Sequence, residues 1–161
     1  MKVEVKIQLN PEEILYDIKN RTYLKSRTGL EGDSYVAASD SIADGGEETD
    51  NQLTRTMGNA IAQIRARLSE YAGSGTTTAN DALAGPQQET LTLLLPANYN
   101  TAVTNQLATW AHMFVVNQTL ADWYSLTNSE NSEYYTTLAA ANLDSIEGLV
   151  YKRKRPERQQ Q

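Results

Sequence analysis

Few side chains in this sequence could carry out chemistry, and they are widely spaced. The 161-residue chain has no cysteine, which excludes disulfides, thiolate metal ligands and a cysteine nucleophile. Its one histidine is His112, in TWAHMFVV, and no acidic residue is near it in sequence. A lone histidine cannot form a two-histidine metal site. The pattern therefore favours packing in a core or an interface over catalysis.

Two pairs of adjacent carboxylates could serve as an acid and a base, Glu12 with Glu13 and Glu47 with Glu48. Both pairs are expected at the first turn of a helix, where acidic side chains stabilise the helix dipole. The structural explanation is therefore favoured for both pairs.

Two glycine-containing segments could bind ions. GSGTTT, residues 73–78, lacks the lysine of a nucleotide-binding loop and follows a predicted helix instead of a strand. DGGEETD, residues 44–50, lacks the alternating ligands of a calcium loop and leaves open only weak calcium binding. We expect no catalytic residue, metal site or cofactor, and we do not expect an enzyme.

The charge is distributed unevenly along the chain. Residues 152–161 contain five of the 14 Lys and Arg and one of the 20 Asp and Glu, so they carry +4 and residues 1–151 carry −10. An acidic body repels DNA and anionic membranes, whereas a basic segment is attracted to either, or to an acidic protein surface.

The basic segment YKRKRPER has three interpretations: a solvated charge run that suits the negative end of a helix, a nucleic-acid contact, or an extended arm that reaches an acidic neighbouring subunit. Apart from Tyr151 it lacks the interleaved aromatics of a single-strand binder. We favour the arm, because its charge complements that of the body. The candidate partner-binding residues are Lys152, Arg153, Lys154, Arg155, Pro156 and Arg158.

The N-terminal half predicts a strand followed by helices. VEVKIQL alternates apolar and polar residues from Val3 to Leu9, as in a half-buried strand. Asn10 is a candidate cap for a helix over residues 11–27, whose apolar side has Ile14, Leu15 and Ile18, with Tyr23 and Leu24 further along. A short helix is expected from Asp33. A long amphipathic helix is expected from Asp50, as N-cap, to Gly73.

The C-terminal half predicts a second strand and a helical hairpin. Residues 73–90 are expected to form a flexible loop, and TLTLLLP a strand with Leu91, Leu93 and Leu95 on one face. Helices are expected over residues 101–127, buried on several sides, and over residues 132–151, joined by a short turn and therefore antiparallel.

These elements predict a mainly α fold: a bundle of three main helices plus shorter N-terminal helices, with a small two-strand β element. We expect one domain over residues 1–151 and a basic C-terminal arm over residues 152–161. The two strands could pair with each other or with those of neighbouring subunits. The N-terminus does not resemble a signal peptide, and no run of about 18 apolar residues exists, so a cytoplasmic site of synthesis is expected.

Tyrosine is the commonest aromatic, with nine residues. Seven of them are spread over predicted helix ends and turns: Tyr16, Tyr23, Tyr99, Tyr124, Tyr134, Tyr135 and Tyr151. Tyrosine suits interfaces because one end of its side chain is apolar and the other forms hydrogen bonds. These residues either contact a partner or border the domain's own core.

Residues 91–158 carry a resemblance to a known family. The long helix that ends in ADWYSLTN, the antiparallel helix after it and the terminal KRKRP resemble small virion-neck proteins of tailed phages and of prophages of gut bacteria. These are similar in outline to the head–tail connector (adaptor) family. The N-terminal strand and the loop at residues 73–90 depart from the plainest connector pattern.

The resemblance implies a structural virion protein that forms a homo-oligomeric ring between portal and tail, assembled in the host bacterial cytoplasm and located in the virion neck. Its partners would be further copies of itself, the portal protein and neighbouring neck or tail proteins. DNA would pass through the ring without specific binding, and no membrane is implied. A stopper, a tail terminator and a DNA-associated accessory factor that uses the basic tail remain alternatives.

Overall fold

The computed structural model describes residues 1–27, 42–44, 46–73 and 88–156. In chain order its elements are β1 (Lys2–Leu9), α1 (Pro11–Arg27), α3 (Glu47–Arg67), a 3-10 turn (Ser69–Tyr71), β2 (Glu89–Pro96), a second 3-10 turn (Thr101–Val103), α4 (Thr104–Thr127) and α5 (Ser129–Val150). The expected helix from Asp33 and most of the expected loop lie outside the described residues. The mainly α fold with a small two-strand element is confirmed.

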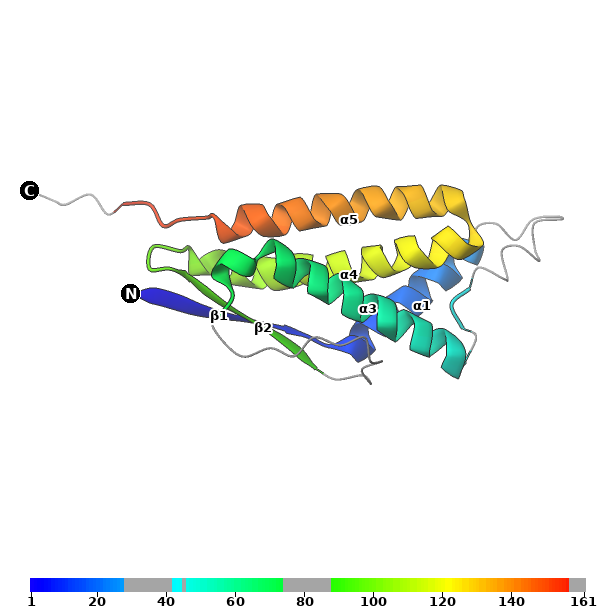
Figure 1. Cartoon of the computed structure of the whole chain (residues 1–161). Coiled ribbons are helices and arrows are strands. Elements are labelled where there is room, and N and C mark those ends of the chain that lie inside the picture. The colour runs from blue at the N-terminus through cyan, green and yellow to red at the C-terminus, as the bar shows by residue number, and fades with distance from the viewer. Residues whose placement is uncertain (28–41, 45, 74–87, 157–161) are drawn as a thin grey trace, which may run out of the picture.

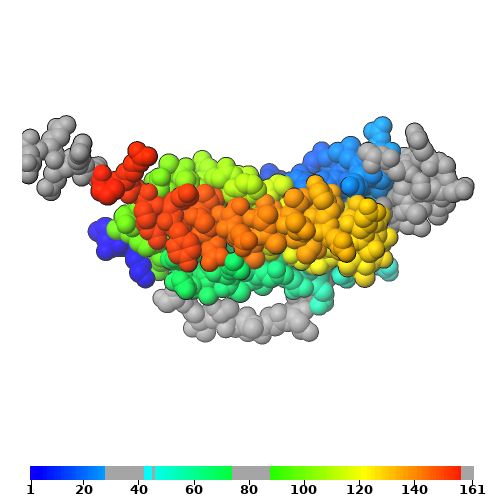
Figure 2. Space-filling model, turned by 90° about the horizontal axis from the view of Figure 1, so that it is seen from above, coloured from blue at the N-terminus to red at the C-terminus, as the bar shows by residue number. Residues whose placement is uncertain are grey.

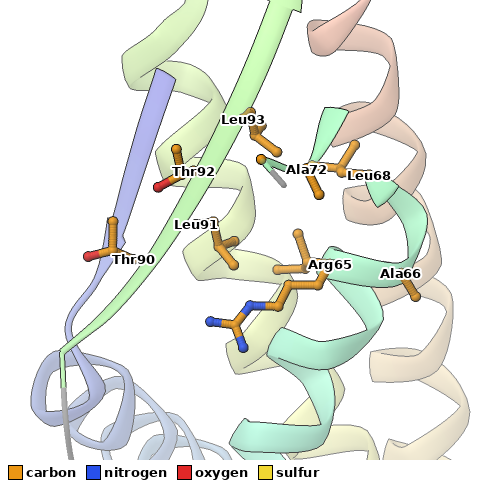
Figure 3. Close-up of a pocket in the computed structure, with 10 residues that line it drawn as sticks. Arg65, Ala66, Leu68, Ala72, Thr90, Leu91, Thr92 and Leu93 are labelled. Carbon is orange, nitrogen blue, oxygen red and sulfur yellow. The ribbon is translucent and has the colours of Figure 1, made fainter. Parts of the chain in front are cut away.

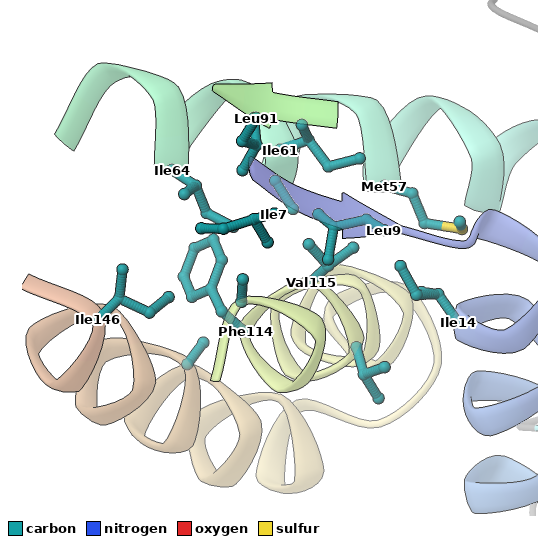
Figure 4. Close-up of a cluster of buried hydrophobic side chains, with 14 of the residues drawn as sticks. Ile7, Leu9, Ile14, Met57, Ile61, Ile64, Leu91, Phe114, Val115 and Ile146 are labelled. Carbon is teal, nitrogen blue, oxygen red and sulfur yellow. The ribbon is translucent and has the colours of Figure 1, made fainter. Parts of the chain in front are cut away.

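The two strands pair with each other in antiparallel order, with Val5 opposite Leu93 and Ile7 opposite Leu91. Alternate side chains of both strands are buried, as the period-2 pattern predicts. Figure 4 shows Ile7, Leu9 and Leu91 directed toward side chains of α3 and α4. The polar face of the sheet is directed away from this core.

Helix α1 begins at Pro11, and the side chain of Asn10 accepts a hydrogen bond from the Glu12 amide at 3.0 Å, so the predicted cap is confirmed. The prediction of which side chains of α1 are buried is wrong for the second half of the helix. Tyr23 and Leu24 are about half exposed, and Thr22 and Ser26 are buried instead. The buried positions follow Ile14 and Ile18 at steps of four, and on this face the helix changes from apolar to small hydroxyl side chains.

Helix α3 begins at Glu47, three residues before the predicted N-cap. The N-cap is Gly46, whose φ of 79° lies in the left-handed region that glycine tolerates. Asp50 lies inside the helix and forms an ion pair with Lys19 at 2.7 Å. The apolar residues of α3 recur at steps of three and four and are buried, as an amphipathic helix requires: Leu53, Met57, Ile61, Ile64 and, just after the helix, Leu68.

Helix α4 is the central element, as predicted. It contacts α5, α3, α1 and β1, and ten of its side chains are buried. One residue, Asn128, separates it from α5, so the two helices form an antiparallel hairpin (Figure 1). The side chain of Asn128 accepts a hydrogen bond from the Asn131 amide at 3.3 Å. This cap starts α5 at Ser129, three residues earlier than predicted.

The described helices are too short or too polar to cross a membrane.

Candidate functional site

The first residues of the basic C-terminal segment are attached to the bundle. The backbone amide of Lys154 donates to the carbonyl of Asn98 at 2.8 Å, and the Asn100 amide donates to the carbonyl of Lys152 at 3.0 Å. These bonds form an antiparallel bridge between Tyr99 and Arg153. Residues 152–154 therefore lie along the connection between β2 and α4, at the same end of the molecule as the start of β1 (Figure 1).

Arg153 has a role within the domain. Its guanidinium donates to the carbonyl of Val150 at 2.8 Å and to that of Lys152 at 3.3 Å. Val150 is the last residue of α5, so a positive charge lies where the helix has unpaired carbonyls and the negative end of its dipole. Arg153 therefore matches the first interpretation of the segment, in which its charge suits the negative end of a helix.

The other described basic side chains of the segment are exposed. In an extended segment successive side chains alternate, so Lys152 and Lys154 are directed away from the side that Arg153 occupies. Neither they nor Arg155 forms a salt bridge within the described residues. Lys2 lies opposite Pro96, close to this segment, and adds another positive charge to the same end. Pro156 is exposed, and Arg158 lies outside the described residues.

The base of the segment is fixed by packing. Tyr99, which bridges to Arg153, is fully buried. The Tyr151 ring meets the Tyr71 ring edge to face, with centroids 6.1 Å apart. A hydrogen bond with Tyr71 raises the pKa of Tyr151. Nearby, Arg67 of α3 contacts Glu147 at 2.6 Å and Asp144 at 3.1 Å on α5, and the hydrogen bond to Glu147 raises the pKa of Arg67.

His112 has an acidic neighbour that the sequence did not indicate. Its Nε2 lies 2.7 Å from Asp17 Oδ2, across the contact between α4 and α1. One turn further along α1, Arg21 donates to Asn117 at 3.1 Å, and Asn117 donates to Asn142 of α5 at 2.7 Å. These bonds form a polar seam that joins three helices, and no pattern within any one helix predicts it.

A pocket of about 780 Å³ lies between the end of α3 and β2 (Figure 3). Its walls include the apolar Leu68, Ala72 and Leu91. Thr90 and Thr92 also line it, but their side chains are directed to the other face of β2 (Figure 3). Arg65 is its only charged lining residue among those described, and Arg65 is paired with Glu89 at 2.8 Å. This pocket contains neither His112 nor Asp17, so it does not gather them into a catalytic group.

The paired carboxylates lie where the sequence placed them, in the first turns of α1 and α3. Among the described residues, no three His, Cys, Asp or Glu side chains are grouped so that they could hold a metal ion. The segments proposed for phosphate and calcium binding lie partly outside the described residues.

The tyrosines divide between the core and the surface of the domain. Tyr99, Tyr124 and Tyr135 are buried in the domain's own core. Four others are exposed by about half or more: Tyr16, Tyr23, Tyr134 and Tyr151.

Comparisons of the chain with protein-family models, with curated proteins and with solved structures find no match.

Proposed function

We propose that this chain is a structural virion protein, a head–tail connector (adaptor) of a tailed phage or prophage, which forms a homo-oligomeric ring between portal and tail. In this proposal the basic C-terminal segment docks on a neighbouring subunit or on the portal. The chain acts through binding surfaces and needs no cofactor.

The observation that supports the proposal most is the distribution of charge over the fold. A body with a net charge of −10 ends in a segment of +4, and hydrogen bonds hold the start of that segment at one end of the molecule. Opposite charges in different places on one surface favour contacts between unlike patches of successive copies. Such heterologous contacts generate rings when the rotation closes. An acidic body also suits a ring that DNA traverses without being held.

The test is the mass of the full chain in solution, measured by sedimentation over a range of concentrations with and without short duplex DNA. The proposal predicts an assembly larger than a dimer that does not require DNA. A monomer at every concentration would contradict it.

A DNA-associated accessory factor is the second candidate, and a specific observation favours it. Lys2, Lys152, Lys154 and Arg155 are exposed at the same end of the molecule, and clustered positive charge is what phosphate neutralisation requires. This candidate predicts DNA binding that weakens steeply with salt and is lost in the variant Lys152→Glu/Lys154→Glu. The proposed connector predicts assembly in the absence of DNA.

A further inference from the structure

One face of α1 is exposed along most of the helix. Its side chains recur at steps of three and four residues, as one face of a helix requires, and they are Glu12, Glu13, Tyr16, Asn20 and Tyr23, which we call the α1 outer face. All five are exposed, and Tyr16 is 68% exposed. The opposite side of α1 packs into the core through Ile14 and Ile18.

The composition of this face suits a cationic ligand. Glu12 and Glu13 form no salt bridge within the described residues. Acids at a helix start are accounted for by the dipole, but two tyrosines exposed on the same face are not. Tyrosine rings attract cations to their faces, and tyrosine is enriched among residues that dominate binding energy.

The molecule already stacks a cation on this face. The Arg27 guanidinium lies 5.8 Å from the centroid of the Tyr23 ring. No such cation is found over Tyr16 among the described residues, although both carboxylates lie within one turn of it. A basic side chain there would meet a ring and two negative charges together.

We propose that the α1 outer face receives the basic C-terminal segment of a second copy of this chain, with Lys152 and Lys154 directed at Glu12, Glu13 and Tyr16. This inference rests on the proposed function, because it names the surface that the segment would contact in the ring. Figure 2 shows the described residues of the C-terminal segment and α1 toward opposite ends of the molecule.

The contact has to join two copies. Lys2, at the start of β1, lies opposite Pro96, two residues before the carbonyl that holds Lys154. Strand β1 then runs eight residues, about 26 Å at 3.3 Å per residue, before α1 begins. Lys152 and Lys154 are hydrogen-bonded to the bundle at the far end of this strand, so they cannot form an ion pair with Glu12 or Glu13 of their own chain.

Charge reversal tests the contact. The acceptor variant Glu12→Lys/Glu13→Lys and the donor variant Lys152→Glu/Lys154→Glu should each weaken self-association by about tenfold or more, and a chain with all four changes should recover most of the loss. The matched control is Glu47→Lys/Glu48→Lys, which reverses two adjacent acids at another helix start and should leave association within about threefold of the wild type. Wild-type association in the acceptor variant would overturn the inference.

A second readout separates this inference from the proposed function. A synthetic peptide of residues 151–161 is titrated into the full chain by calorimetry, and binding should weaken about fivefold or more in Tyr16→Ala but not in Leu126→Ala. A monomeric chain that binds the peptide in this way would contradict the ring and support the contact. Assembly without peptide binding would overturn the contact and leave the ring. If the donor variant lost duplex DNA binding while its assembly was unchanged, that result would also overturn the proposed contact.

Discussion

Tyr124 has a buried hydroxyl group for which the described residues provide no hydrogen-bond partner. Its ring stacks on Tyr135, with centroids 5.5 Å apart and planes within 6°. Burial disfavours the charged phenolate and raises the pKa of both tyrosines. Tyr124 therefore stabilises the core through its ring, whereas its hydroxyl adds a desolvation cost.

The substitution Tyr124→Phe should be neutral or stabilise the protein, by up to about 1 kcal/mol, because it removes an unpaired buried hydroxyl and keeps the ring. The folded state holds the Tyr124 proton to a higher pH than the unfolded state, where the pKa is 10.0. The neutral Tyr124 side chain contributes fully to stability below the unfolded-state pKa. As the pH rises above that value, the unfolded state loses its proton first, and the free energy of unfolding falls.

The advantage of Tyr124→Phe over the wild type should therefore grow between about pH 8 and about pH 11. Urea unfolding at both pH values measures it. An advantage that shrinks with rising pH would contradict this explanation.

Asn142 should be costly to remove, because it is buried and accepts a hydrogen bond from the Asn117 amide. Asn142→Ala should lower the free energy of unfolding by about 1–3 kcal/mol, since it leaves a buried donor without its partner. Thr137→Ala, on the exposed side of the same helix, is the control and should change it by less than about 0.5 kcal/mol. Equal losses in the two variants, measured by urea unfolding, would show that the polar seam adds no stability.

For single residues, the sequence predicted which side chains are buried better than it predicted which side chains contact each other. The apolar alternation of β1 and the apolar steps of α3 identified buried positions correctly, because burial follows the local period. The contact between His112 and Asp17 joins residues 95 apart, and Arg21 lies 96 residues from Asn117. Such pairs depend on how α1 lies against α4, which a single sequence does not encode as a local pattern.

The ends of helices were also predicted correctly only where local residue preferences decide them. The start of α1 was predicted correctly from Asn10 and Pro11, whose preferences act locally. Asp50 is equally suited to an N-cap, but α3 starts earlier at a glycine, and the Asp50 carboxylate pairs with Lys19 of α1. A contact with another helix thus replaced the local role that the residue type suggested.

Residues 152–154 act as part of the bundle, although composition suggested a separate arm. Arg153→Ala should lower the free energy of unfolding by about 1 kcal/mol, because α5 loses a charged hydrogen-bond donor at its C-terminal carbonyls. Lys152→Ala, one residue earlier, should have little effect, because its exposed side chain forms no ion pair within the described residues.

Thermal unfolding of the two alanine variants checks this prediction. A truncation after Tyr151 should also destabilise the bundle, whereas one after Pro156 should not, since the backbone bonds to Asn98 and Asn100 are kept. A chain truncated after Tyr151 that unfolds like the wild type would show that the bridge is dispensable.

At the scale of the whole molecule, the charges lie in two separate places. The exposed lysines of the C-terminal segment lie at the end of the molecule where β1 begins, and the acids of the α1 outer face lie beyond the far end of β1. In an isologous dimer two copies exchange the same contact and the assembly stops there, whereas a heterologous contact places the lysines of one copy on the acids of the next and continues until a ring closes.

The most direct test of the proposed ring is the mass of the intact chain by native mass spectrometry, at low and at moderate salt. A ring joined through the basic C-terminal segment should have one defined mass, a multiple of 17.9 kDa larger than a dimer, and should be lost in the variant Lys152→Glu/Lys154→Glu. A monomer, or an assembly that keeps its mass in that variant, would contradict the claim that copies associate through the basic C-terminal segment.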